Sequence, residues 1–157
     1  SLNNKLSQNF NYVLTISLVY KKKNNMSMHP LTIMDGKLPS LYPYADKKDL
    51  FTLTHAEHTH IKKFRKFQLL EKYKKNITTK QIKNIRNKIE KDMNFYFPDF
   101  KKIFNFKNYF LSHKVLPNEN TAKRSTFIER NKNIISCSSP KIGNIFTFQK
   151  YIKKIID

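Results

Sequence analysis

The sequence has few of the residues on which several common kinds of protein site depend. It contains a single cysteine, Cys137, so no disulfide can form within the chain and a disulfide-stabilised secreted domain is excluded. Its two glycines, Gly36 and Gly143, lie far apart, and neither belongs to the glycine-rich turn of a phosphate-binding loop. The uncharged stretch from Leu6 to Tyr20 is too short and too polar to span a bilayer, so we expect no membrane anchor.

Acidic residues are also scarce. The chain has 11 Asp and Glu residues against 31 Lys and Arg residues, which gives a formal net charge of +20 over 157 residues. Abundant Lys, Asn and Ile are typical of an A/T-rich coding sequence, but such a bias does not deplete Asp and Glu, whose codons it also permits. The scarcity of acids therefore indicates a polyanionic partner, most simply RNA. Self-repulsion at this charge favours a subunit stabilised by its surroundings over an isolated compact monomer.

The length of 157 residues predicts one domain. The hydrophobic periodicity of the sequence predicts a mostly α-helical chain, and its charge predicts that the chain is non-compact and stabilised by its assembly. We expect an extended or irregular N-terminal segment over residues 1–45, a basic helical region over 46–113, and a polar loop with a C-terminal helix over 114–157. Within the first segment, residues 10–20 are rich in β-forming side chains that alternate with a period of two, which favours a strand. An apolar stripe with helical spacing also fits these residues. Pro30, Gly36, Pro39 and Pro43 then exclude a continuous helix.

Three to four amphipathic helices are predicted in the rest of the chain. The first begins at a cap near Asp46 or Thr54 and runs to about Lys75, and others cover residues 79–96, 100–111 and about 145–156. Thr78 and Gln81 have the spacing of a capping box for the second helix. Its apolar stripe, and that of the last helix, are expected to contact neighbouring proteins or one another.

Basic and aromatic residues are interleaved over residues 62–67 and 100–107. Lys and Arg side chains reach phosphates, while aromatic rings pack against protein or stack on exposed bases. Lys predominates over Arg, which favours neutralisation of the RNA backbone over reading of base sequence. The alternative interpretation is a set of ordinary amphipathic helices with a solvated Lys face. The residues predicted to contact RNA are Lys62, Lys63, Arg65, Lys66, Lys72, Lys74, Lys75, Lys101 and Lys102.

Three short pieces of the sequence follow one another in a recognisable order: Pro30-Leu31-Thr32, Leu38-Pro39-Ser40 and Tyr44-Ala45-Asp46. Together with the basic stretch after them, they resemble a block of the large-subunit mitochondrial ribosomal protein fifty-two family, over about residues 29–75. The chain departs from the family's pattern by an insertion at Met34–Lys37 and by Lys47 in place of a small residue. From about Asn76 onward it would be a lineage-specific extension.

The resemblance implies an extended segment and a long helix bound to ribosomal RNA and neighbouring ribosomal proteins in the mitochondrial matrix, without a catalytic role. The acid-free residues 1–34 fit the remnant of an organellar presequence, although such a remnant is usually richer in Arg. The sequence therefore predicts a structural constituent of the mitochondrial ribosome, of the large subunit. The alternative is a non-catalytic accessory subunit of a mitochondrial respiratory-chain or ATP synthase complex.

The stretch from His55 to His60 is the one cluster that invites a metal site. On a helix His55 and His58 share a face that His60 does not, and on a strand His58 and His60 share a face that His55 does not. The spacing fits known ligand patterns loosely and no cysteine supports it, so we interpret the stretch as a helix start with imidazoles near phosphate or solvent. A metal-dependent hydrolase is the alternative. We expect no enzyme activity, cofactor, bound metal or small-molecule substrate.

Overall fold

A computed structural model describes residues 10–23, 27–44, 47–117, 126–138 and 142–156. Contacts between residues divide the chain into two compact units, a larger one over residues 7–117 and a smaller one that holds residues 118–157. Among the described residues, no helix has the length and apolar character that a membrane crossing requires.

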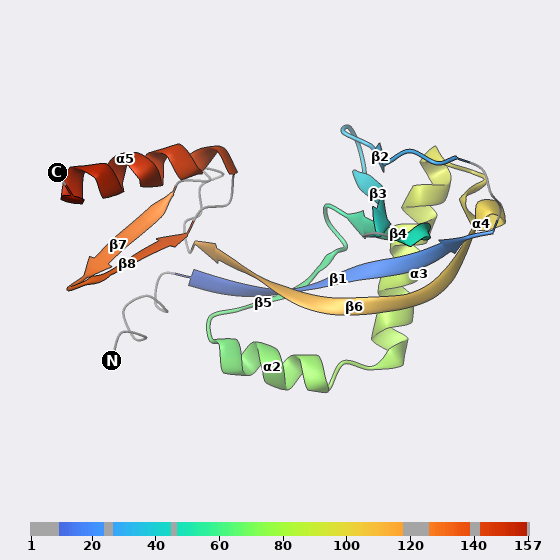
Figure 1. Ribbon diagram of the computed structural model, residues 1–157. Coiled ribbons are helices and arrows are strands. Elements are labelled where there is room, and N and C mark those ends of the chain that lie inside the picture. Colours follow the sequence, from blue (N-terminus) through green and yellow to red (C-terminus); the bar gives the residue numbers. More distant parts are fainter. Residues whose placement is uncertain (1–9, 24–26, 45–46, 118–125, 139–141, 157) are drawn as a thin grey trace. The chain divides into compact units, whose positions relative to one another are not determined.

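The larger unit is built on an antiparallel sheet of six strands. These are β1 (Phe10–Lys22), β2 (Leu31–Thr32), β3 (Pro39–Tyr44), β4 (Lys47–His55), β5 (His60–Phe64) and β6 (Phe104–Pro117). Strand β1 is central, and β6 pairs with it along its whole length (Figure 1). The other edge of β1 is shared, because β5 pairs with its first half and β4 with its second half. Strands β3 and β2 follow β4 outward.

One face of this sheet is covered by helices α2 (Phe67–Lys75), α3 (Thr79–Tyr96) and α4 (Phe100–Ile103). Ile89 and Met93 of α3 are fully buried in one core cluster with Ile16 and Leu18 of β1. The ring of Phe67 in α2 lies 5.7 Å from that of Tyr12, which has the same parity along β1 and therefore projects from the same face. All three helices thus pack on one side, and the opposite face of the sheet consists of the alternate residues of each strand.

The predictions of a strand over residues 10–20 and of a helix over residues 79–96 are confirmed. The capping box is formed: the Gln81 backbone N–H donates to Thr78 Oγ1 (3.3 Å) and the Thr78 N–H donates to Gln81 Oε1 (2.8 Å). The apolar stripe of α3 packs on the chain's own sheet, so the expectation that it contacts neighbouring proteins or the last helix is wrong.

The prediction of a mostly α-helical, non-compact chain is wrong. Residues 47–55 and 60–64 form strands β4 and β5 where one long helix is expected, and the helix covers only residues 67–75. Most of the third predicted helix is β6, and α4 has four residues. The physical reason is the long central strand: β1 offers two edges of backbone donors and acceptors, and pairing satisfies them over most of its length.

The smaller unit contains a hairpin of β7 (Phe127–Asn131) and β8 (Ile134–Ser138), a 3₁₀ turn η2 (Ile142–Asn144) and helix α5 (Ile145–Ile156). The predicted C-terminal helix is confirmed. The predicted loop over residues 114–143 is wrong where β6 continues to Pro117 and where the hairpin forms.

Candidate functional site

Seven of the predicted RNA-contacting residues lie on one continuous stretch that runs from strand β5 to the end of helix α2. We call this stretch the basic segment; it contains Lys62, Lys63, Arg65, Lys66, Lys72, Lys74 and Lys75. All of these side chains are exposed except that of Lys74, which is half-buried. The last three occupy the final turn of α2, where the negative end of the helix dipole stabilises positive charge.

The positive charges of the basic segment are not neutralised by ion pairs among the described residues. Within the described part of the chain, none of its side chains forms an ion pair with a carboxylate. Lys62 contacts aromatic rings instead, since its Nζ lies 4.9 Å from the Tyr73 ring centroid and 5.7 Å from that of Phe64. The remaining cations face water or a partner.

Lys101 and Lys102, the other two predicted RNA contacts, are placed elsewhere. They lie on α4, at the opposite end of β1 from α2 (Figure 1). Each is paired with an acid: Lys101 Nζ is 3.1 Å from Glu90 Oε2, and Lys102 Nζ is 2.8 Å from Asp99 Oδ1. The structure therefore does not bring them into the basic segment, and part of their charge is already neutralised.

Two of the clustered histidines, His55 and His58, lie beside the carboxylate of Asp92, which no sequence pattern identifies. Residues 55–60 are the end of β4, a turn over residues 56–59 and the start of β5, not the predicted helix start. Asp92 of α3 lies beside this turn. The Asp92 Oδ2 atom is 3.3 Å from His55 Nε2 and 3.4 Å from His58 Nε2. These separations resemble those between zinc ligands, roughly 3.3 Å for metal–nitrogen bonds of about 2.0–2.1 Å in a tetrahedral site. His60 does not belong to this group of three.

The hydrogen bonds of His55 nevertheless argue against a metal at this cluster. Its Nδ1 accepts from the backbone N–H groups of Glu57 (3.1 Å) and His58 (3.2 Å), so in the neutral ring the proton sits on Nε2, the nitrogen that faces Asp92. The rings of His55 and His58 are stacked, with planes 16° apart, so their in-plane lone pairs cannot converge on one ion. Asp92 is also already engaged by Lys37, whose Nζ is 2.7 Å from Oδ1.

This cluster therefore acts as a structural junction. It ties α3 to the β4–β5 turn and to Lys37, which follows the left-handed turn residue Gly36. Any side chain at Gly36 would collide with the Tyr96 hydroxyl, and that hydroxyl accepts a hydrogen bond from the Lys37 N–H (3.1 Å). Glycine at this position thus allows the close approach that delivers Lys37 to Asp92.

The junction has a defined electrostatic state. Burial lowers the pKa of the His55 imidazole below its usual range, His58 lowers it further, and Asp92 offsets these effects only in part. Burial raises the pKa of the Asp92 carboxyl, but the hydrogen bond and charge of Lys37, with the two imidazoles, outweigh burial and leave that pKa below its usual range. At neutral pH the junction consists of a carboxylate, an ammonium and a neutral buried imidazole.

We expect the larger unit to lose stability as the pH falls below the ordinary histidine pKa of about 6.5, because the unfolded chain then binds protons that folded His55 excludes. A His55→Asn variant keeps an acceptor for the two backbone N–H groups but cannot titrate. Its free energy of unfolding, measured by urea denaturation between pH 7.5 and 5.5, should fall less steeply than that of the parent. The matched control is His29→Asn at an exposed histidine; equal slopes for both variants and the parent would contradict the prediction.

Comparison of the sequence with models of protein families, and of the chain with curated proteins and with solved structures, finds no match. The similarity at residues 29–75 to the ribosomal protein fifty-two family therefore stays a prediction.

Proposed function

We propose that this chain is a non-catalytic RNA-binding protein, a structural constituent of a ribonucleoprotein particle. The observation that carries the proposal is the basic segment: seven cations on one stretch, none of them paired with a carboxylate within the described residues. In a chain of net charge +20, these exposed cations are suited to an outside partner with many negative charges. Phosphate contacts of this kind position a protein on RNA without reading its sequence.

The sequence favours the large subunit of the mitochondrial ribosome as this particle. The protein would then act in the mitochondrial matrix. This finer assignment is supported by the resemblance of residues 29–75 alone. The partners would be ribosomal RNA at the basic segment and neighbouring ribosomal proteins elsewhere on the surface.

Contact with proteins is supported by the smaller unit, which exposes large apolar side chains. Ile134 of β8 is 50% exposed, and Ile145 and Phe146 at the start of α5 are 60% and 65% exposed. Ile145 and Phe146 are consecutive residues, and exposed apolar side chains of this kind are available for contact with a partner. An accessory subunit of a respiratory-chain or ATP synthase complex would share this feature, but it would not need the excess of positive charge.

Sedimentation of cell extracts separates the two proposals. The endogenous protein, detected by an antibody, should migrate with a large particle that contains ribosomal RNA. Treatment with ribonuclease should shift it to the top of the gradient, because removal of the RNA removes the phosphates that hold it. Migration with a membrane complex that ribonuclease leaves intact would contradict the RNA proposal and support the alternative.

A further inference from the structure

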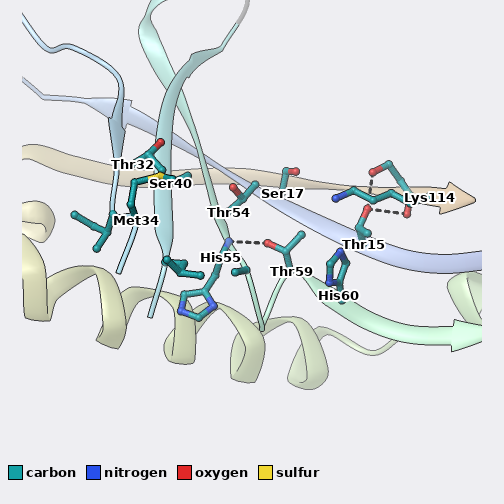
Figure 2. Close-up of a pocket in the computed structure, with 14 residues that line it drawn as sticks. Thr15, Ser17, Thr32, Met34, Ser40, Thr54, His55, Thr59, His60 and Lys114 are labelled. Atoms are coloured by element: carbon teal, nitrogen blue, oxygen red, sulfur yellow. Dashed lines mark hydrogen bonds between the residues drawn. The ribbon is translucent and has the colours of Figure 1, made fainter. Parts of the chain in front are cut away.

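The face of the sheet opposite the helices carries a patch of short hydroxyl side chains. Thr32, Ser40 and Thr54 are cross-strand neighbours on β2, β3 and β4. Thr15 of β1 lies opposite Ser112 of β6, and their hydroxyl oxygens are 2.7 Å apart. Figure 2 shows the Thr and Ser side chains of β1 to β4 lining a common pocket with Ser17, and Ser112 also belongs to its lining.

Short side chains are unusual at the centre of an open sheet face in a chain so rich in lysine. The solvent face of an antiparallel sheet normally carries polar residues of any length, and long charged chains would fill the space above it. Here the small hydroxyls leave a cavity of about 420 Å³. That volume is within the range of pockets that hold small molecules, roughly 300–1,000 Å³.

The two ends of the cavity differ in chemistry. At one end are Lys114 and His60 (Figure 2), and Lys114 carries the only formal charge among the described residues that line the cavity. Partial burial lowers the pKa of the His60 imidazole and the charge of Lys114 lowers it further, so the ring is neutral at pH 7 and can both donate and accept. Met34 lies toward the other end (Figure 2), and Ile33 and Leu38 also contribute apolar surface to the lining.

Among the described residues that line the cavity there is no carboxylate, so a cationic ligand finds no counter-charge there. A phosphate dianion would require more than one cation, an arginine fork or a helix N-terminus, and the lining residues include none of these. One ammonium with nearby hydroxyls matches a singly charged carboxylate, and the hydroxyls of Ser17, Ser40 and Thr54 match polar groups along the ligand.

From this arrangement we infer that the open sheet face binds a small organic acid. The carboxylate lies against Lys114 and Ser112, a hydroxyl or similar group contacts the central Ser and Thr residues, and an apolar tail contacts Ile33, Met34 and Leu38. The site is independent of the proposed RNA-binding role, although Lys63 of the basic segment and Lys114 pair with the same residue, Val13, from opposite edges of β1.

The test uses the full chain, labelled with ¹⁵N, and 2-hydroxyhexanoate as the probe. A ligand of this size is expected to bind with a dissociation constant on the order of 1 mM. Titration should shift the backbone amide signals of Thr15, Ser17, Thr54 and Lys114. Hexan-1-ol and hexylammonium, which lack the carboxylate, should bind at least about tenfold more weakly, because they cannot pair with Lys114.

Variants locate the site. Lys114→Gln should weaken binding of 2-hydroxyhexanoate at least about tenfold, and Ser17→Val, which fills the hollow, should weaken it as well. The matched control is Lys107→Gln, an exposed lysine of the same strand outside the cavity, which should leave binding unchanged. Native dispersion of the amide spectrum shows that each variant is folded.

Three results would overturn the inference: absence of shifts at the cavity amides, equal binding of hexylammonium, or unchanged affinity in Lys114→Gln. A short RNA hairpin that shifts the cavity amides while the acid shifts none would assign this face to RNA and would also overturn it. Loss of RNA binding by the chain would affect the proposed function alone.

Discussion

Replacing Lys63, Arg65 and Lys66 by glutamate should weaken the binding of the chain to a short RNA hairpin by about 100-fold or more at moderate salt. Each substitution removes a phosphate contact and places a negative charge beside the RNA backbone. The three side chains are exposed and unpaired within the described residues, so their replacement leaves the core intact. Lys62 is left unchanged in this variant because it packs on two aromatic rings. Fluorescence anisotropy with a labelled hairpin measures the affinity.

The matched control reverses the same number of charges elsewhere. Lys83, Lys88 and Lys91 are exposed on α3, and their replacement by glutamate lowers the net charge by the same amount. We expect this control to weaken binding only slightly, through the long-range field. Equal losses in the two variants would mean that net charge alone attracts RNA and that the basic segment is not the site.

Replacing Glu90 by alanine should lower the free energy of unfolding by about 2–3 kcal/mol, because it leaves buried partners without an acceptor. Glu90 is 5% exposed and lies on the face of α3 that packs on the sheet. The buried Tyr20 hydroxyl donates to its Oε1 at 2.7 Å, and Arg86 Nε is 2.9 Å from the same oxygen. Burial and this hydrogen bond raise the pKa of Tyr20, so the phenol stays protonated and needs the acceptor.

A double-mutant cycle with Tyr20→Phe isolates the hydrogen bond. When the phenol hydroxyl is already absent, removing the carboxylate no longer leaves that hydroxyl without an acceptor. The double variant should therefore lose about 1 kcal/mol less free energy of unfolding than the two single variants lose in sum. Urea denaturation measures all four proteins. The control Glu57→Ala, at an exposed carboxylate, should change stability by less than about 0.5 kcal/mol. Additive single effects in the cycle would show that Glu90 does not satisfy Tyr20.

Local sequence patterns were sufficient to predict the helices and strands whose formation depends on their own residues. The capping box of Thr78 and Gln81 and the stripe of Ile82, Ile89 and Met93 mark α3 without reference to the rest of the chain. Residues 47–55, 60–64 and 104–117 are strands because β1 is available as a partner, and that pairing is not visible in their own periodicity. Apolar residues recur at every third position from Ile61 to Tyr73 in the sequence, but this run is divided between strand β5 and helix α2, which no single period describes.

The candidate sites also include features that local sequence predicts and features that depend on the tertiary fold. Exposure of the basic segment follows from sequence, since charged side chains are rarely buried without partners. The pairing of Lys101 with Glu90, and the meeting of His55 and Asp92, depend on how α3 crosses the sheet. The residues that line the hydroxyl-lined cavity come from six strands, so no single run of residues predicts it.

We propose that the cations of the basic segment neutralise RNA phosphates. The dependence of RNA affinity on salt concentration counts these contacts. Contacts by seven cations predict a slope of log affinity against log salt concentration of about −5 to −6, since each neutralised phosphate contributes about −0.7 to −0.9. In the Lys63, Arg65 and Lys66 variant the slope should be shallower by about two to three, and in the α3 control it should be unchanged. A slope near zero for the parent chain, or the same slope for all three proteins, would contradict the account.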